Sequence, residues 1–274
     1  KNCITLHSKV LHCQVEFGID YDSLIEELVG LVVERPNKAD NGTLSGHAAG
    51  EPFEKLTYHL LKDKYAGKIF KQFEYLNDLY LKNPRNISVE ARKALFESPV
   101  ALFLLSRSDK ATRDWNPENV FAEKQDDTAD ILWYDDGKFD LIDVKTRNMS
   151  KRAMAPNIIS AYKLVQACAL MIDNNDFSSV GIHYMEVEWL EEQDSLRCIN
   201  AHWRNLFRCN PSSLYINWAA AMQIQFHVSE LDQSFNGTVE QWARAYIREF
   251  VRSAEARCDK MYRTYVLPFK KYIE

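Results

Sequence analysis

Two aspartates and a lysine are the side chains whose types and spacing could support chemistry. Asp130 and Asp143 lie thirteen positions apart within the segment ADILWYDDGKFDLIDVK, and Lys145 follows Asp143 by two positions, so the two share a face of any strand. Carboxylates held close together repel unless a cation lies between them, and hard oxygen ligands with room for water suit Mg²⁺. A bound Mg²⁺ would acidify a coordinated water and neutralise charge on a phosphodiester, while Lys145 could orient that water or deprotonate it. These residues therefore predict metal-assisted phosphodiester hydrolysis without a covalent intermediate.

A β-hairpin must bring these side chains together, and the sequence contains its turn. The Asp-Gly pair at 136–137, between two apolar-rich runs, is the strongest short-range signal for a two-residue hairpin loop. If Asp135 pairs with Lys138, the ladder places Asp130 directly opposite Asp143, with their Cβ atoms roughly 5 Å apart. A second interpretation remains open, because an Asp, a dozen residues and Asp-x-Lys recur by chance, and polar hairpin residues are often only solvated.

Length and composition fit an ordinary folded enzyme. The 274 residues are 46% hydrophobic, enough to fill a substantial core in one large domain or two small ones. The longest apolar runs, such as Val100 to Leu105 and Ala167 to Ile172, are too short to span a bilayer, and no signal-peptide pattern is present. We therefore expect a soluble, cytoplasmic protein without a membrane partner. The cysteines lack CxxC spacing and indicate reduced thiols: Cys3, Cys13, Cys168, Cys198, Cys209 and Cys258.

Charge is distributed unevenly along the chain. The formal net charge of −5 does not suggest a nucleic-acid binder. Between Val144 and Ile172, however, no residue is acidic and five are basic: Lys145, Arg147, Lys151, Arg152 and Lys163. Contacts with phosphate could therefore begin beside the predicted metal site. The Arg and Lys residues after Gln241 have two interpretations, a solvated helix face or a DNA contact.

Helical and strand patterns alternate along the chain without internal repeats, which indicates a mixed α/β fold. Helices are predicted over Asp22–Val33, from Glu51-Pro52 onward, over Glu74–Leu81, Val89–Phe96 and Pro99–Leu105, from about Ile159 to Ile172, and from a capping box at Thr238 and Gln241 to about Arg263. Strands are predicted over Phe70–Phe73, in the hairpin described above, over Gly181–Trp189 and in its hairpin partner at Ser195–Ala201. The segment Asn37–Gly50 is rich in turn residues.

Five runs of sequence resemble the HincII family of restriction endonucleases. They are GTLSGHAAGEPFEKL (Gly42 to Leu56), DTADIL (Asp127 to Leu132), DVKTRN (Asp143 to Asn148), APNIISAYKL (Ala155 to Leu164) and LYINWAAAMQIQFHV (Leu214 to Val228). The runs are long and in order, so they are far more specific than the Asp/Asp-x-Lys pattern alone. The resemblance extends from roughly residue 22 to the end.

The resemblance implies a fold, an activity and partners. The fold would be a restriction-endonuclease-like core, a mixed central β-sheet flanked by helices with a catalytic β-hairpin. Residues 22–274 would form a single endonuclease domain, after an N-terminal extension, residues 1–21, of unclear role. The family implies a homodimer in the bacterial cytoplasm that uses Mg²⁺ to cut both strands of duplex DNA. The implied target is GTYRAC, where Y is a pyrimidine and R a purine, cut at its centre to leave blunt ends.

The resemblance also assigns roles to particular residues. Asp130 and Asp143 would be the metal ligands and Lys145 the catalytic lysine, as the hairpin argument predicts. The residues expected to contact DNA are Asn157, Tyr215, Asn217, Met154, Ala153, Arg147 and Lys151. Asn157 has an equally good alternative role as a helix cap after Pro156. At Met154 the family has a glutamine that inserts between base steps, so methionine would offer an apolar wedge instead, with an altered flanking preference or cleavage rate.

Two other functions fit parts of the same pattern. A repair or junction nuclease on the same core would cut by DNA structure rather than by sequence. A DNA-binding protein with an inactive metal site would bind the hexamer without cutting it. The intact set of two aspartates and a lysine argues against the second alternative.

Overall fold

The computed structural model describes residues 18–36, 46–72, 74–75, 87–105, 128–152, 154–220 and 222–273, without the side chains of 46–49. The helices in these ranges are α1 (Tyr21–Leu28), α2 (Gly46–Lys64), α4 (Val89–Glu97), α5 (Pro99–Leu105), α7 (Ala161–Asp173) and α8 (Val239–Met261). The strands are β1 (Val32–Glu34), β2 (Ile69–Lys71), β3 (Ile131–Asp135), β4 (Lys138–Asn148), β5 (Asn157–Ser160), β6 (Val180–Glu192), β7 (Ser195–Asn205), β8 (Ile216–Asn217) and β9 (Gln223–Gln225). The short helical turns are η2 (Leu206–Arg208), η3 (Pro211–Ser213), η4 (Val228–Glu230), η5 (Tyr262–Val266) and η6 (Leu267–Tyr272).

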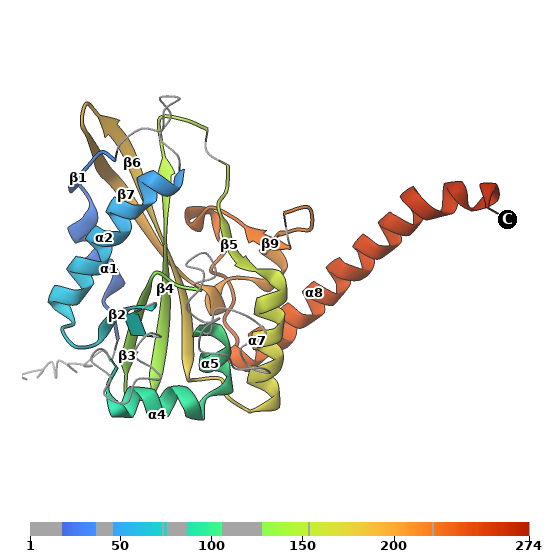
Figure 1. Cartoon of the computed structure of the whole chain (residues 1–274), viewed down its shortest axis with the longest axis horizontal. Coiled ribbons are helices and arrows are strands. Elements are labelled where there is room, and N and C mark those ends of the chain that lie inside the picture. The colour runs from blue at the N-terminus through green and yellow to red at the C-terminus, as the bar shows by residue number, and fades with distance from the viewer. Residues whose placement is uncertain are drawn as a thin grey trace, which may run out of the picture.

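The strands form two sheets, and the larger one is mixed. Its order is β1-β7-β6-β4-β3-β2, in which β4 and β6 run parallel and the other neighbouring pairs are antiparallel. A crossover through β5 and α7 joins the parallel pair (Figure 1). The smaller sheet has the order β5-β9-β8. This architecture confirms the predicted α/β fold, a mixed central sheet flanked by helices that includes the expected hairpin, β3–β4.

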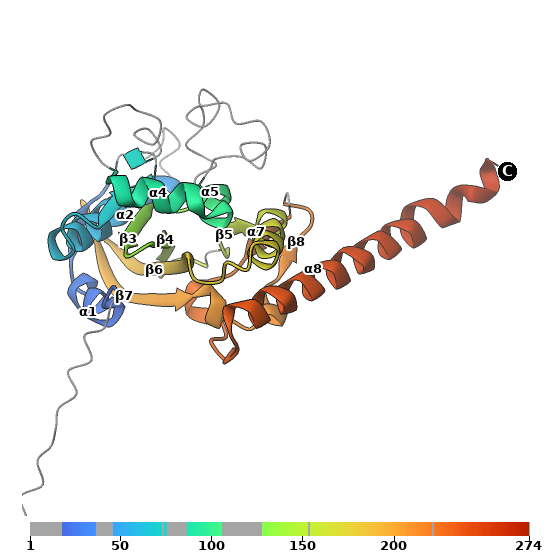
Figure 2. The ribbon, with the colours of Figure 1, turned by 90° about the horizontal axis from the view of Figure 1, so that it is seen from below.

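Alternating side chains on the central strands build a core on each face of the large sheet. On β4, Leu141 packs into one cluster of buried residues and its neighbour Ile142 into the other; on β6, Tyr184 and Met185 divide in the same way. Helices α1 and α2 share the core with Ile142, whereas α4, α5, α7 and the first turns of α8 share the core with Leu141. The sheet is curled (Figure 2). Because both faces of the central strands are buried, these strands can hold a functional side chain firmly.

The first helix is shorter than predicted. Instead of spanning Asp22–Val33, α1 ends at Leu28. Gly30, with a φ of +89°, then turns the chain into β1, which pairs with β7. Pairing with a strand far along the chain thus overrides the local helical pattern, which carries no information about β7.

The second helix begins earlier than predicted. Its opening was expected at Glu51-Pro52, but α2 starts at Gly46 and Pro52 lies inside it. Proline cannot donate to the carbonyl four residues earlier, yet the helix forms because its side chains Phe53 and Leu61 are fully buried against the sheet.

The start of α7 also differs from the prediction. Ile159 was expected in the helix but lies in β5, which pairs with β9. The helix begins at Ala161, and Ser160 caps it by accepting a hydrogen bond from the backbone N–H of Lys163 at 3.3 Å. A short apolar run is ambiguous between strand and helix, and the partner strand decides here.

Most other elements agree with the predictions to within a few residues. The helix α5 has the predicted bounds, and the predicted hairpin of β6 and β7 forms, although both strands are longer. Both hydrogen bonds of the capping box at Thr238 and Gln241 are present at the start of α8. The strand expected over Phe70–Phe73 is β2. The segment Asn37–Gly50 and the helix predicted over Glu74–Leu81 lie mostly outside the described residues.

Two predictions made from composition concern membranes and thiols. Within the described ranges, no helix combines the length and the apolarity that crossing a membrane requires. Cys168, Cys198, Cys209 and Cys258 are free cysteines in the structure, and Cys3 and Cys13 lie outside the described residues.

Candidate active site

The turn of the β3–β4 hairpin has the geometry that its sequence predicts. Asp136 and Gly137 both have a positive φ, 44° and 80°, as a type I′ turn requires. Asp135 pairs with Lys138 across the turn, which confirms the predicted register. The side chains of the two strands are therefore placed by a turn whose two residues are suited to it.

Asp130 and Asp143 meet at the open end of this hairpin. The paired ladder ends with Ile131 and Ile142, one position before the two aspartates. The backbone N–H of Asp130 donates to the carbonyl of Ile142 at 3.1 Å, and its carboxylate Oδ2 accepts a hydrogen bond from the N–H of Val144 at 2.8 Å. Asp130 is thus fixed against the segment of β4 that carries Asp143, as the register argument requires.

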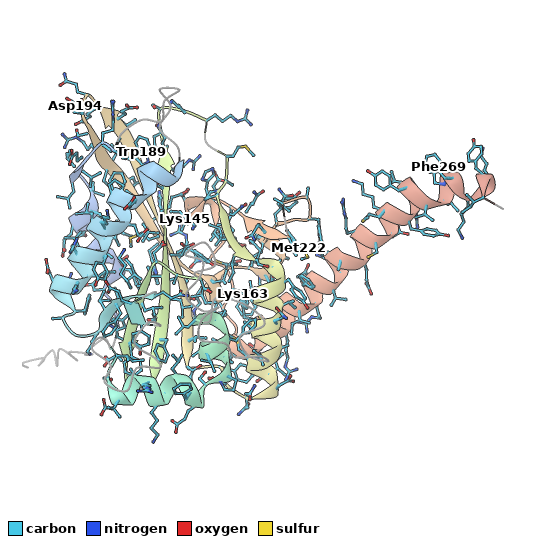
Figure 3. The ribbon with its side chains drawn as sticks, in the orientation of Figure 1. Lys145, Lys163, Trp189, Asp194, Met222 and Phe269 are labelled. Atoms are coloured by element: carbon cyan, nitrogen blue, oxygen red, sulfur yellow. The ribbon has the colours of Figure 1, made fainter. Side chains whose placement is uncertain are left out.

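Lys145 lies beside the two carboxylates. Its Nζ is 2.8 Å from each carboxylate oxygen of Asp143, and it lies on β4 in the body of the molecule (Figure 3). Burial tends to lower the pKa of Lys145, but the charges of Asp143 and Asp130 outweigh burial, and the pKa is raised. The ammonium form is therefore favoured in this arrangement, in which Lys145 donates a hydrogen bond to Asp143.

Burial raises the pKa of Asp130 to about 7, and the neighbouring charge of Asp143 adds to the rise. Lys145 and the N–H of Val144 act in the opposite direction but do not cancel it. A carboxylate whose charge is disfavoured by burial and by a neighbouring carboxylate is stabilised by a nearby cation. That is the electrostatic signature of a cation-binding site.

The donor set fits a hard divalent ion that keeps much of its own hydration. Oδ2 of Asp143 is buried and makes no hydrogen bond within the described part of the chain, although Lys145 lies close to it. The described residues contain no group of three or more His, Cys, Asp or Glu side chains arranged for a metal. A cation here would have Asp130 and Asp143 as ligands and oxygen atoms of water or phosphate for the rest, as Mg²⁺ prefers.

A third carboxylate, Glu54 on α2, lies near the site. Its Oε1 is 2.5 Å from Nζ of Lys71, and its charge contributes to the raised pKa of Lys145. A Cβ on Gly50, one turn earlier, would lie 3.8 Å from Oγ1 of Thr146, which shows how closely α2 approaches β4. The sequence analysis gave Glu54 no role, because its position depends on how α2 packs across the sheet.

Glu186 is a second residue that the sequence did not reveal. It is fully buried and lies beside Lys145 in the parallel pairing of β4 and β6. Its Oε1 lies 3.0 Å from Nδ1 of His227, and its Oε2 accepts hydrogen bonds from the N–H and the hydroxyl of Ser229, each at 3.1 Å. Glu186 therefore fastens the segment at η4 to β6, the strand that pairs with β4.

The predicted phosphate-binding residues have different surroundings. Arg147 lies 3.5 Å from Glu230 and 3.9 Å from Glu188, so its guanidinium group already forms ion pairs within the chain. Lys151 is exposed. Ala153 lies outside the described residues. The side chain of Met154 is 88% exposed, which is unusual for a large apolar residue.

The small sheet brings together the residues expected to contact bases. Asn157 lies on β5 and Asn217 on β8, while Tyr215 precedes β8 with its side chain 66% exposed. Gln225 on the central strand β9 joins the two asparagines: Nδ2 of Asn217 donates to its Oε1 at 2.8 Å, and its Nε2 donates to Oδ1 of Asn157 at 2.7 Å. Ser160 caps α7, so the alternative role of Asn157 as a helix cap is wrong.

The direction of this amide chain is set at one end by the backbone. Oδ1 of Asn217 accepts hydrogen bonds from the N–H groups of Ala219 and Ala220, at 3.0 and 3.2 Å. Its Nδ2 must therefore donate to Gln225, which in turn must donate to Asn157. The Nδ2 of Asn157 is left as the outward-facing donor, on an exposed residue. The sequence analysis had not identified Gln225, although it lies within the run LYINWAAAMQIQFHV.

Comparisons with known proteins place the whole arrangement in context. The family described as restriction endonuclease HincII matches residues 24–273. The type II restriction enzymes HindII, from Haemophilus influenzae strain Rd, and HincII, from Haemophilus influenzae, are each 56% identical over 253 residues, covering 92% of this chain and 97% of theirs. The structure of the NlaIV restriction endonuclease matches with a TM-score of 0.36 and 10% identity, over 87% of this chain and 88% of that one.

Proposed function

Because the chain belongs to the HincII family of type II restriction endonucleases, we propose that it cuts both strands of duplex DNA at GTYRAC and leaves blunt ends. Site-specific cleavage of DNA is what a type II restriction enzyme does; the hexamer and the central cut are inferred from the resemblance of the five sequence runs. The observation that carries the proposal is the convergence of Asp130, Asp143 and Lys145 at the end of one hairpin.

We propose Mg²⁺ as the divalent metal ion, with Asp130 and Asp143 as its ligands. The chemistry that a bound Mg²⁺ supplies is acidification of a coordinated water and neutralisation of the charge that develops on the phosphodiester. Lys145 holds its proton at Nζ beside both carboxylates and donates to the attacking water or to a phosphate oxygen. The chain's own contribution is thus to keep two carboxylates and one ammonium together in a largely desolvated place.

The small sheet would read the bases. The outward Nδ2 of Asn157 offers donors, which suit the acceptor atoms that purines and thymine present in a groove. Tyr215 and Asn217 lie on the neighbouring segment, and Gln225 fixes the orientation of both asparagine amides. Amide groups are neutral, so base selection through them would not require a positively charged chain, and this chain has a net charge of −5.

Phosphate contact and bending would come from the segment that joins β4 to β5. Lys151 is exposed and available to phosphate, whereas Arg147 must exchange Glu230 for a phosphate oxygen. The family resemblance also assigns Ala153, which lies outside the described residues, to DNA contact. The exposed Met154 would insert between base steps as an apolar wedge.

A twofold-symmetric target calls for two copies of the chain, so we propose a homodimer in the bacterial cytoplasm. Residues 22–274 would form one domain in each copy. Residues 1–21 would be an extension, of which Tyr21 stacks on Trp203 with ring centroids 4.3 Å apart.

Digestion of a plasmid with one GTYRAC site, in Mg²⁺, tests the proposal. We expect a single blunt cut at the centre of the site, found by sequencing the ends, and no cut in the same plasmid with the site scrambled. Cuts at other positions would contradict the specificity, and cuts that follow branched or mismatched structures would favour the repair or junction nuclease. Binding of the site without cutting would favour the inactive binder.

A further inference from the structure

The strand β9 of the small sheet leads directly into a segment that packs on the large sheet. Gln225, the last residue of β9 and the holder of the two asparagine amides, is followed at once by Phe226 and His227 and then by the turn η4. The small sheet lies beside β4 and β6 in both views of the molecule (Figures 1 and 2). A short stretch of chain thus joins the surface expected to read bases to the large sheet.

Phe226 packs against β6 beside Asp143. Its ring meets the ring of Tyr184 edge to face, with the centroids 5.6 Å apart. Tyr184 is buried, and in the parallel pairing of β4 with β6 it is the partner of Asp143. Edge-to-face pairs of aromatic rings prefer a defined geometry, so this contact helps to hold the end of β9 at one place on β6.

His227 makes a polar contact with β6 beside Lys145. Its Nδ1 lies 3.0 Å from Oε1 of Glu186, and both side chains are buried. Glu186 is the partner of Lys145 in the same strand pairing. Because paired residues of neighbouring strands point to the same face, Glu186 lies on the face of the sheet that carries Asp143 and Lys145. The loss of this contact would leave a buried polar group with one partner fewer, which makes the position of His227 costly to change.

The turn η4 adds further contacts on the same face. The N–H and the hydroxyl of Ser229 both donate to Oε2 of Glu186 at 3.1 Å. Nη1 of Arg147, which lies two positions beyond Lys145 on β4, donates to Oγ of Ser229 at 3.4 Å. Residues 226–229, which we name the link, therefore contact β6 through both carboxylate oxygens of Glu186 and contact β4 through Arg147.

We infer that the link positions the small sheet relative to Asp130, Asp143 and Lys145 for cleavage, with His227 as its principal positioning residue. The bases that the small sheet would read lie at a fixed number of steps from the phosphodiester that is cut, so the two parts must keep one spacing on the DNA. The link contacts β6 at the two residues paired with Asp143 and Lys145. A displacement of about 1 Å between reacting groups can lower a rate by about 100-fold. The inference rests on the proposed function and adds the element that joins its two parts.

Separate measurements of binding and cleavage by the full chain test the inference. In His227→Ala, the affinity for a GTYRAC duplex and its ratio to the affinity for a scrambled duplex should stay within about threefold. Both affinities are measured in chains that also carry Asp143→Ala, so that no cleavage disturbs them. The single-turnover rate constant with Mg²⁺ at saturating protein should fall about 10-fold or more in His227→Ala alone. His227→Asn keeps a side-chain N–H donor close to the place of Nδ1, so it should recover the rate to within about threefold.

The matched control is His202→Ala. His202 is the partner of Glu186 on β7, but its Nε2 lies 3.5 Å from Glu188 and 3.1 Å from Nδ2 of Asn200. The change removes a histidine from the same region and leaves the contact of His227 in place, so the rate should stay within about twofold. Thermal unfolding and the amplitude of the single-turnover reaction report the folded, active fraction, which separates lower stability from slower cleavage.

Ser229→Ala is a milder change of the link. It removes the hydroxyl donor to Glu186 but keeps the backbone N–H donor. We expect unchanged binding and a rate about two- to fivefold lower. This variant keeps the inference testable if His227→Ala does not fold, because an unchanged rate in Ser229→Ala would then overturn it.

A His227→Ala chain that cuts as fast as the original, with full amplitude, would overturn the inference. A loss of affinity or selectivity in place of a loss of rate would also overturn it, because His227 would then support reading alone. Equal loss of rate in His227→Asn would overturn the role of the N–H donor. If the original chain cuts a different sequence, the proposed hexamer fails, and the same comparison on that sequence decides the inference. If the original chain binds DNA without cutting it, the proposed nuclease fails and the inference fails with it.

Discussion

The β3–β4 hairpin and the small sheet differ in how they hold polar side chains. In the hairpin, Asp143 and Lys145 are charged and largely withdrawn from water, and adjacent strands hold them. In the small sheet, Asn157 and Asn217 are neutral, and a chain of amide hydrogen bonds through Gln225 holds them. Chemistry on phosphate needs concentrated charge, whereas selection among bases needs donors and acceptors of fixed direction. Because the two regions use different interactions, a substitution in one should change DNA cleavage without changing base selection, and a substitution in the other should do the reverse.

The largest expected effect is at the charged region. Replacing Asp143 with alanine removes a proposed metal ligand and the ion-pair partner of Lys145. The transition state should lose several kcal/mol of stabilisation, so the cleavage rate should fall about 10³-fold or more. Single-turnover cleavage of a labelled GTYRAC duplex measures this loss. Asp135→Asn is the matched control, because Asp135 lies on the same hairpin but pairs with Lys68 near the turn. If both variants cut equally well, the hairpin is not the catalytic element.

The next effect belongs to the neutral region. In Gln225→Glu the new carboxylate can only accept, so Asn157 must turn its Nδ2 inward and present Oδ1 to the DNA. Selectivity for the proposed hexamer should fall by about 1 to 3 kcal/mol for each affected base pair, or roughly 5- to 150-fold. Competition binding against duplexes with one changed base pair measures it. The control Gln223→Glu places the same charge on the same strand outside the amide chain. Unchanged selectivity in Gln225→Glu would contradict the claim that the amide chain through Gln225 selects the bases.

A third prediction concerns Asp140, which lies on β4 like Asp143 but has different charged partners. Asp140 lies 3.1 Å from Nε2 of His183 and 2.9 Å from Nζ of Lys138. Burial tends to raise the pKa of Asp140, but these two partners outweigh burial and the pKa is lowered. Its carboxylate therefore stabilises the fold above its unfolded pKa of about 3.9, and this contribution is lost as the pH falls through the lower folded pKa.

Asp140→Asn should accordingly lower the free energy of unfolding by about 1 to 3 kcal/mol at pH 6 and by progressively less below pH 4. Urea denaturation at several pH values measures the difference. Cleavage by the folded variant should be close to that of the original chain, in contrast to Asp143→Ala. A stability loss that is constant from pH 3 to pH 7 would contradict the assigned charge pairing.

The smallest effect is expected at the exposed wedge. Met154→Gln restores, at this exposed position, the residue type that the family resemblance implies. As the proposed wedge, the changed residue should alter how the DNA step is opened rather than which bases are contacted. We expect the cleavage rate on different flanking sequences to change by about fivefold or less, with the same hexamer cut. Rates on a panel of flanking sequences test this, and a change in the hexamer itself would assign Met154 to reading rather than bending.

The two regions also differ in how far the sequence predicts them. The hairpin is local: the Asp-Gly turn at 136–137 sets the register, and the register places Asp130 beside Asp143. The small sheet joins three separate segments, and local periodicity assigned Ile159 to a helix because it carries no information about β9. Only the resemblance to a family singled out Asn157 and Asn217 in advance. Gln225 and Glu54 could not be found from local sequence, because their roles arise from contacts between distant elements.

Binding by the Asp143→Ala chain tests most directly the claim that one region cuts and the other reads. Its affinity would be measured for a duplex that contains GTYRAC and for the same duplex with the site scrambled, at one salt concentration and without cleavage to disturb the equilibrium. The claim predicts tight, selective binding without any cut. Equal affinity for both duplexes would contradict it, because the selectivity would then depend on the catalytic carboxylate rather than on the small sheet.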